Sequence, residues 1–258
     1  MAESAPDHGV TAGGQERSSG VGRDARVSSV TLPMGSGWGP RFPIVRALCE
    51  PPAVTSSSAP SSAPLAVRER AALADLLDDL GPDAPTCCDG WTTGHLAAHL
   101  VVRDRRPDAG PGYALESLPI GRRLHAHSAR LEERLRTSIP YPEVVARVRA
   151  GAPVWTPMGL PGLGNLVNGG EYAIHHEDVR RAQPGWEPRE LDRADRDLLW
   201  RTATLFARRV RGGVTLRRAD VPGTEKRIGK GGPALEGDPM ELLLWTSGRR
   251  GVARVTTS

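Results

Sequence analysis

Apolar residues recur with a helical period through most of the chain after residue 64, and this pattern limits the possible folds more than any other feature. In the stretch LAVRERAALADLLDDL, residues 65–80, leucine and alanine return every three or four positions, and Gly81 and Pro82 end the pattern. Such a segment forms a helix with one buried face, so it needs partners to pack against. The pattern predicts a mainly α fold.

Further segments carry the same signal. The stretch TTGHLAAHLVVRDRR begins with threonines suited to capping a helix, and Pro107 ends it. A long loop rich in proline and glycine is expected over residues 152–170. The remaining helices are expected at 120–138, 141–151, 171–181 and 193–210.

The character of the chain changes at residue 212. Short segments with glycine turns, at 212–220, 226–237 and 251–258, predict strands, and DPMELLLWTSGRR between them predicts a helix. At the other end, residues 1–64 are rich in Gly, Ser and Pro, a composition typical of disorder. The expected organisation is a disordered extension (1–64), a helical bundle (65–211) and a small α/β C-terminal domain (212–258).

Composition excludes several classes of function. Arginines are interspersed with acids and aromatic residues are only 4% of the chain, so no basic stripe with stacking platforms predicts a nucleic-acid partner. No stretch approaches the roughly 18 apolar residues of a membrane helix. The three cysteines are Cys49, Cys87 and Cys88, and an odd count with two adjacent favours a reducing compartment, so a cytoplasmic location is expected. Cys87 and Cys88 could supply a reactive thiol or a ligand, but adjacent side chains diverge, so we interpret them as half-buried small residues at a helix entrance.

The stretch EYAIHHEDVRR, residues 171–181, contains the strongest chemical signal. Glu171 and His175 are four residues apart, so on a helix they share a face, with Cβ atoms about 6 Å apart, and can reach one ion. A catalytic zinc site uses three protein ligands. His99 is the best third ligand, because it lies among leucines and alanines, where an unpaired polar group costs about 1–3 kcal/mol.

From spacing alone, other interpretations stay open. Asn168 could cap a helix with Glu171 three residues later, which would make Glu171 part of a capping box in a metal-free bundle. His99 could be a core histidine bonded to a backbone carbonyl. His95, four residues before it, offers a rival helical pair. The adjacent His175 and His176 could also lie on the surface.

Three stretches together resemble a known family. They are GPDAPTCCDGWTTGHLAAHLVVRDRRPDAGPG, NLVNGGEYAIHHEDVRRAQPGWEPREL and ELLLWTSGRRGVARV, in this order. They resemble the actinobacterial metal-binding family related to mycothiol-dependent maleylpyruvate isomerase, within the DinB-like superfamily. The resemblance runs from about residue 65 to the C-terminus. The LAAHL motif is moderately specific alone, but joined to E-x-x-x-H-x-x-D about seventy residues later it is specific.

The resemblance implies a DinB-like four-helix bundle that binds one divalent metal, zinc. The ligands would be His99, Glu171 and His175, and the family's pattern has no counterpart of His95. His176 and Asp178 would hydrogen-bond these ligands. The two arginines that follow, Arg180 and Arg181, are expected at the surface or on a substrate carboxylate.

The implied chemistry is that of a mycothiol-dependent S-transferase or isomerase. A thiol that coordinates the cation loses its proton, so it becomes a nucleophilic thiolate at neutral pH. In the related isomerase, the thiolate adds to the double bond of the substrate, permits rotation and leaves. The expected partners are a low-molecular-weight thiol, mycothiol, and a small electrophile. The alternative is a non-catalytic metal-binding or sensing module, which four protein ligands in a closed coordination sphere would favour.

Overall fold

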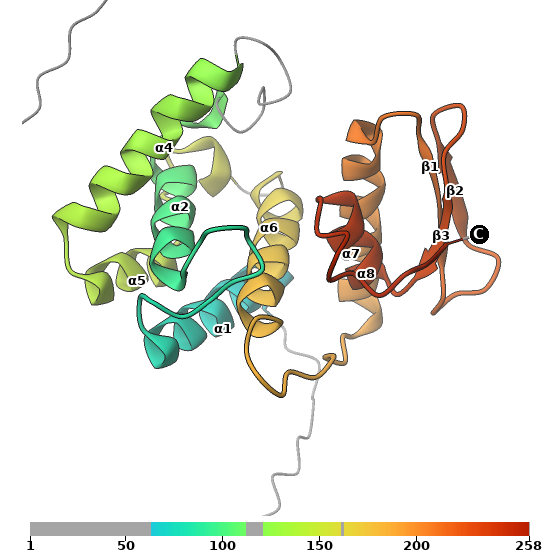
Figure 1. The fold of residues 1–258 in the computed structure, drawn as a ribbon, viewed down its shortest axis with the longest axis horizontal. Coiled ribbons are helices and arrows are strands. Elements are labelled where there is room, and N and C mark those ends of the chain that lie inside the picture. Colours follow the sequence, from blue (N-terminus) through green and yellow to red (C-terminus); the bar gives the residue numbers. More distant parts are fainter. Residues whose placement is uncertain (1–62, 112–120, 161–162, 258) are drawn as a thin grey trace, which may run out of the picture. The chain divides into compact units, whose positions relative to one another are not determined.

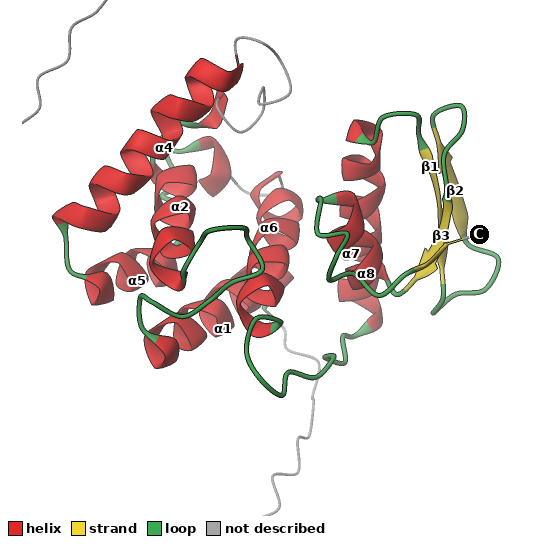
Figure 2. Ribbon diagram, in the orientation of Figure 1, coloured by secondary structure: helices red, strands yellow, loops and turns green. Residues whose placement is uncertain are grey.

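The computed structural model describes residues 63–111, 121–160 and 163–257 (Figure 1). The predicted disordered extension, apart from its last two residues, lies outside the described residues, and so does Cys49. The described helices are α1 (Leu65–Leu80), α2 (Thr93–Arg105), α4 (Gly121–Ser138), α5 (Tyr141–Ala150), α6 (Leu163–Arg180), α7 (Arg193–Phe206) and α8 (Pro239–Thr246). Helices dominate and strands are confined to the C-terminal part (Figure 2). The prediction of a mainly α fold with a small α/β C-terminal part is confirmed.

The end of α1 and the start of α2 agree with the sequence-based prediction. Gly81 follows α1 with φ 73°, a backbone conformation that glycine adopts without strain, and its N–H donates to the carbonyl of Leu77. Thr92 caps α2, and its backbone N–H donates to Nδ1 of His95 at 3.2 Å. His95 therefore belongs to a helix cap.

One apolar core lies among α1, α2, α5 and α6. Tyr141, at the start of α5, adds a hydrogen bond from its hydroxyl to the carbonyl of Leu77, 2.9 Å away. Full burial of several large side chains stabilises this packing by about 1.5–3 kcal/mol each. Its largest fully buried members are Leu73, Leu77, Leu96, Leu100 and Tyr172.

A second core joins α7 and α8 to the sheet. The strands are β1 (Val214–Arg218), β2 (Glu225–Ile228), β3 (Ala234–Gly237) and β4 (Thr256–Thr257), in the spatial order β2-β1-β3-β4. The central pair, β1 and β3, is parallel, and the outer pairs are antiparallel. Asp238 caps α8, which follows β3 directly. The fully buried side chains of this core include Leu199, Leu216, Leu235, Leu242 and Leu243.

The start of α6 differs from the sequence-based prediction. The loop expected over 152–170 ends earlier, because α6 begins at Leu163 and places Asn168 in its interior. A Cβ on Gly169 would lie 3.2 Å from a Leu198 methyl, and one on Gly170 would lie 2.5 Å from the Thr202 methyl. The two glycines thus permit close packing of α6 against α7. The capping-box interpretation of Glu171 is therefore wrong.

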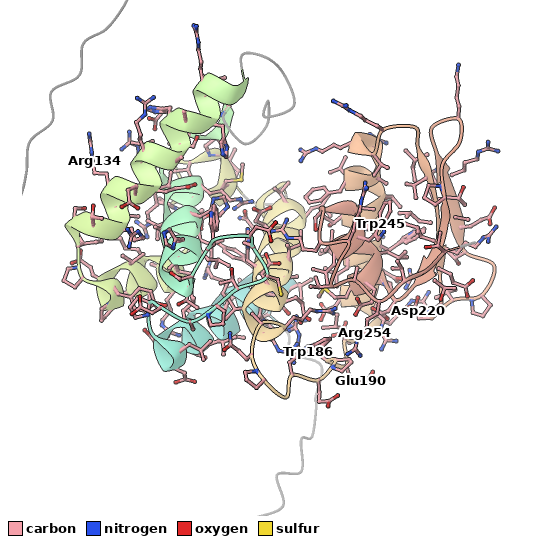
Figure 3. The ribbon with its side chains drawn as sticks, viewed as in Figure 1. Arg134, Trp186, Glu190, Asp220, Trp245 and Arg254 are labelled. Carbon is pink, nitrogen blue, oxygen red and sulfur yellow. The ribbon has the colours of Figure 1, made fainter. Side chains whose placement is uncertain are left out.

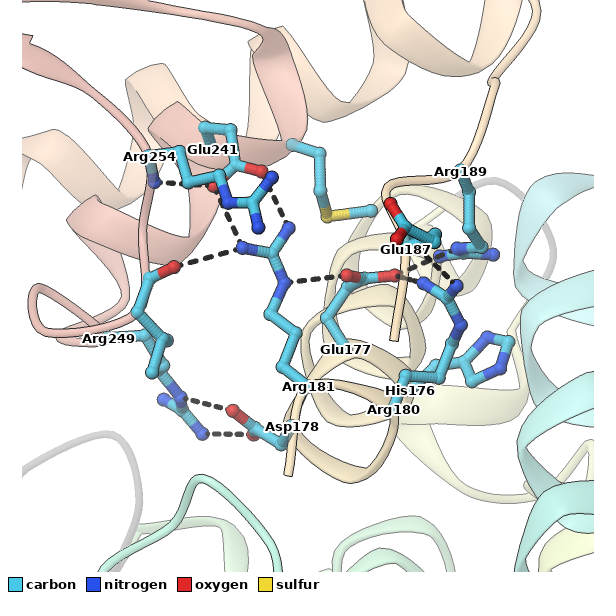
Figure 4. Close-up of polar contacts among 12 residues, drawn as sticks. His176, Glu177, Asp178, Arg180, Arg181, Glu187, Arg189, Glu241, Arg249 and Arg254 are labelled. Carbon is cyan, nitrogen blue, oxygen red and sulfur yellow. Dashed lines mark hydrogen bonds and ion pairs between the residues drawn. The ribbon is translucent and has the colours of Figure 1, made fainter. Parts of the chain in front are cut away.

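Ion pairs connect the C-terminal half of α6 to α8 (Figure 4). Arg181 donates from Nε to Glu177 at 2.7 Å, and its two other guanidinium nitrogens donate to Glu241 at 3.0 and 2.6 Å. Arg181 is buried, so its expected surface position is wrong. The guanidinium groups of Arg181 and Arg254 lie over the Trp186 ring, 4.6 and 4.4 Å from its centroid. Trp186 and Arg254 are labelled in Figure 3.

Within the described part of the chain, none of the helices combines the length and the apolar character that a bilayer crossing requires.

Candidate metal centre

Three side chains from α2 and α6 converge on one point. His99 lies in the middle of α2, and Glu171 and His175 occupy successive turns of α6. The distance from Nε2 of His175 to Oε1 of Glu171 is 3.4 Å, and from Nε2 of His99 to the same oxygen it is 3.8 Å. One ligand atom from each residue lies within 4.8 Å of the other two.

These separations suit a small divalent cation. Zinc binds imidazole nitrogen and carboxylate oxygen at about 2.0–2.2 Å with tetrahedral geometry, which places neighbouring donor atoms roughly 3.3–3.6 Å apart. The 3.4 Å and 3.8 Å separations need little adjustment to match this value. Two neutral nitrogens and one carboxylate also form a donor set that zinc accepts in catalytic sites.

Each of the two histidines is oriented by a carboxylate on its other ring nitrogen. Nδ1 of His99 is 2.9 Å from Oε1 of Glu132 on α4, and Nδ1 of His175 is 2.9 Å from Oδ2 of Asp178. A proton on Nδ1 that is shared with a carboxylate leaves the lone pair of Nε2 for a cation. Both Nε2 atoms face Glu171, so the ring orientations that metal binding needs are present in the fold.

Charges at the centre favour an ionised carboxylate. Burial raises the pKa of Glu171, but Arg103 and the two histidines outweigh that effect and hold it well below its usual range. Burial lowers the pKa of His175, but Asp178, Cys88 and Glu171 together outweigh burial, so the pKa lies well above its usual value. A cation would replace the proton on His175, so binding would release it to solvent.

Arg103 forms an ion pair with Glu171 and links it to neighbouring residues. Its Nε lies 3.4 Å from Oε1 of Glu171, while Nη1 donates to Asp104 at 2.8 Å and to the side-chain oxygen of Asn168 at 2.9 Å. The side-chain nitrogen of Asn168 donates to the carbonyl of Met158, 2.7 Å away, in a 3-10 turn at Pro157–Gly159. Asn168 thus links α6 to α2 and to the preceding turn.

The three converging side chains differ in their exposure to solvent. The Glu171 side chain is 21% exposed, whereas the side chains of His99 and His175 are 9% and 6% exposed. Trp91 covers part of His99, with ring centroids 5.2 Å apart. Among the three side chains, that of Glu171 is therefore the most accessible to solvent.

The two residues that were predicted to support the ligands lie on different faces of α6. Asp178 contacts His175, as described above. His176 is buried and faces α1, where its Nδ1 lies 2.8 Å from Glu69, whose carboxylate also accepts from Arg189 at 2.8 and 3.0 Å. The structure thus brings Asp178, and not His176, to the three converging side chains.

Two further residues lie around His175. The sequence offered Cys88 as a possible ligand but favoured a half-buried small residue, and sequence reasoning overlooked Arg249. The half-buried Cys88 donates from Sγ to Oδ2 of Asp178, 3.2 Å away, and Arg249 donates to both oxygens of Asp178, at 3.2 and 2.8 Å. The backbone N–H of Cys87 also donates to the carbonyl of Asp178, which brings this loop to α6. Burial and the charge of Asp178 raise the pKa of the Cys87 thiol. No spacing rule connects residues 88 and 249 to residue 178.

Comparisons with known proteins give a distant likeness. Two solved structures match, the mycothiol-dependent maleylpyruvate isomerase and a histidine-to-alanine variant of it. For the variant, the TM-score is 0.47 at 16% identity, with 75% of this chain and 90% of that chain covered. For the unmodified isomerase, the values are 0.43, 17%, 75% and 89%. No family model and no curated protein matches the chain. Similarity at this level carries no information on activity.

Proposed function

We propose that this chain binds one divalent cation, zinc, through His99, Glu171 and His175, and uses it as the centre of a mycothiol-dependent S-transferase or isomerase. The observation that carries the proposal is the pair of oriented histidines. Each has a carboxylate 2.9 Å from Nδ1 and directs Nε2 towards Glu171. A buried histidine in a purely structural role needs only one hydrogen-bond partner. Here two histidines with such partners also direct their second nitrogens to one carboxylate, which is the arrangement of metal ligands.

The chain's own residues have distinct tasks in this proposal. Glu132 and Asp178 hold the histidines in the tautomer with a free Nε2. Arg103 stabilises the charge of Glu171 and restricts its rotation. The cation, when bound, lowers the pKa of a coordinating thiol, so that the thiolate is present at neutral pH.

The access beside Glu171 supports a role that involves small molecules. Three protein ligands leave a coordination position open, and a low-molecular-weight thiol can reach it from the exposed side of Glu171. The choice of mycothiol, of a small electrophile and of a DinB-like four-helix bundle rests on the family resemblance of the sequence motifs that contain His99, Glu171 and His175. We assign α1, α2, α4 and α6 to that bundle.

The first test is the metal content of tag-free protein by plasma mass spectrometry. Wild type is expected to carry about one equivalent of zinc, as a single structural or catalytic site requires. His99→Ala and His175→Ala are expected to lose it, whereas His125→Ala, on an exposed turn of α4, is expected to keep it. Wild type that neither contains nor takes up a divalent metal would overturn the proposal.

The second test separates an enzyme from a sensing module. Cobalt(II) in place of zinc gives a visible spectrum that reports its ligands, and a bound thiolate adds a charge-transfer band. We expect mycothiol to produce that band in wild type and not in His99→Ala. A cobalt spectrum that does not respond to mycothiol would favour the non-catalytic metal-binding alternative.

A further inference from the structure

A second group of metal-binding side chains lies on the opposite edge of the His175 ring. Cys88, His175 and Asp178 each present a ligand atom within 4.8 Å of the other two. The shared contact is Oδ2 of Asp178, which is 3.2 Å from Sγ of Cys88 and 2.9 Å from Nδ1 of His175. Cys88 does not belong to the His99, Glu171 and His175 group.

We propose that Cys88, His175 and Asp178 form a second cation position, selective for thiophilic divalent ions such as zinc and cadmium. This position goes beyond the proposed function and does not require the first centre to be loaded. It fills only when metal is added, because Arg249 competes for it, so it does not hold zinc through dialysis. Sulfur, imidazole nitrogen and carboxylate oxygen are a donor set that zinc and similar ions prefer over magnesium or calcium.

The distances agree with coordination. Zinc–sulfur bonds of about 2.3 Å and zinc–oxygen bonds of about 2.0–2.2 Å, at a tetrahedral angle, place sulfur and oxygen about 3.5 Å apart. The Cys88 and Asp178 atoms are 3.2 Å apart, so an ion needs only a small outward shift. The Asp178 side chain is fully buried, which keeps its carboxylate fixed.

Arg249 already supplies a positive charge at this position. Its Nη2 lies 2.8 Å from Oδ2 of Asp178 and 3.5 Å from Sγ of Cys88. Arg249 lies in the segment that follows α8, and its side chain is 23% exposed, so solvent reaches part of it. A metal ion and the Arg249 guanidinium would compete for the Asp178 carboxylate and for the space beside the Cys88 sulfur.

Binding at this position displaces protons. Cys88 releases its thiol proton to solvent when the metal–sulfur bond forms, and His175 must give up the proton on Nδ1. If the first centre holds no ion, His175 can keep its proton on Nε2. If both positions are filled, the imidazole bridges two ions and carries no proton, so the second ion binds more weakly than the first.

The test is a cadmium titration of the full chain in a Cys49→Ser/Cys87→Ser background, which leaves Cys88 as the single thiol. Cadmium bound to a thiolate gives an ultraviolet charge-transfer band, which reports sulfur coordination without any activity assay. We expect the band in this background and its loss after Cys88→Ser. A background protein that binds cadmium without the band would overturn the proposal.

Two further variants identify the position. His99→Ala, which removes a ligand of the first centre, is expected to keep the band, whereas loss of the band would assign Cys88 to the first centre and overturn the proposal. Arg249→Gln is expected to strengthen cadmium binding about tenfold or more, because it removes the competing charge. If Arg249 only supports the local structure, the same variant weakens binding or leaves it unchanged, which would contradict the competition.

Discussion

His175 and His176 are neighbours on α6, and their surroundings are alike in two respects. Both are buried, and each has a carboxylate oxygen within 2.9 Å of Nδ1. The two histidines differ in the residues that surround them. His175 faces His99 on α2 and shares a face of α6 with Glu171, and both present further ligand atoms. His176 faces α1 and an ion-paired cluster with Glu69 and Arg189.

This difference indicates which feature distinguishes a metal-binding histidine from a structural one. Burial and an orienting carboxylate are common to both positions, so neither is diagnostic. Among the described residues, the ligand-atom group around Glu171 includes His175 and not His176. A second donor on the far side of the ring is therefore the feature that supports metal binding.

The largest effect is expected from removal of a ligand charge. Glu171→Gln keeps the size of the side chain but replaces a carboxylate with a neutral amide, so bound zinc should fall from about one equivalent to background. His176→Ala should keep about one equivalent. Metal analysis after dialysis checks both, and the comparison breaks if His176→Ala loses zinc while Glu171→Gln retains it.

Disruption of the network on the other face of α6 should reduce stability instead. Arg181→Met removes the guanidinium that Glu241 shares with Glu177 and leaves the buried Glu241 without this ion pair, which costs about 3–5 kcal/mol. Urea unfolding with a chelator present measures the change. Arg147→Met, which removes an exposed pair with Glu143, is the matched control and should cost less than about 1 kcal/mol. Equal losses in the two variants would contradict the role of burial.

The Glu69 carboxyl should make stability depend on pH in the acid range. Burial raises its pKa, but His176 and Arg189 outweigh burial and lower it to about 2. Because the folded pKa lies below the unfolded value, the stabilisation is present above about pH 4.5 and is lost as the pH falls towards 2.

The size of this effect follows from the shift, about 3 kcal/mol at 1.36 kcal/mol per pKa unit. In the metal-free protein, Glu69→Gln should lower the free energy of unfolding at pH 6 and flatten its decrease between pH 4.5 and 3. Parallel curves for wild type and variant would show that Glu69 does not supply this dependence.

The smallest expected effect is on zinc affinity, and it compares the carboxylate that contacts His175 with the one that contacts His176. Asp178→Asn should weaken zinc binding by about 10- to 100-fold, because the amide no longer fixes the His175 tautomer. Glu132→Gln should act similarly through His99. Glu69→Gln, which alters the pair at His176, should leave zinc affinity unchanged. Competition with a chromophoric chelator measures all three, and equal affinities for Asp178→Asn and wild type would remove the orienting role of Asp178.

Local patterns predicted most helices well. The bounds of α1, α2 and α5 follow from apolar spacing together with Gly81, Pro107 and Gly151. The start of α6 was missed because Gly169 and Gly170 resemble a loop in sequence, although in the structure they permit close contact with α7. A local rule cannot recognise that contact, because its partners, Leu198 and Thr202, lie about thirty residues later.

The candidate site was predictable where its residues share one helix. Glu171, His175 and Asp178 follow helical spacing, and His99 stood out as a polar residue in an apolar segment. Glu132 lies on an arginine-rich helix with many exposed acids, and Cys88 and Arg249 lie in loops, so only the tertiary fold places them here. The cytoplasmic location, the absence of a nucleic-acid partner and the domain boundaries stay predictions.

The most direct measurement of the central claim is the zinc X-ray absorption spectrum of wild type loaded with one equivalent of zinc. We expect only nitrogen and oxygen neighbours at about 2.0–2.2 Å, with the outer scattering of two imidazole rings from His99 and His175. A sulfur neighbour at about 2.3 Å, or no imidazole scattering, at this stoichiometry would contradict the assignment of the primary centre to His99, Glu171 and His175.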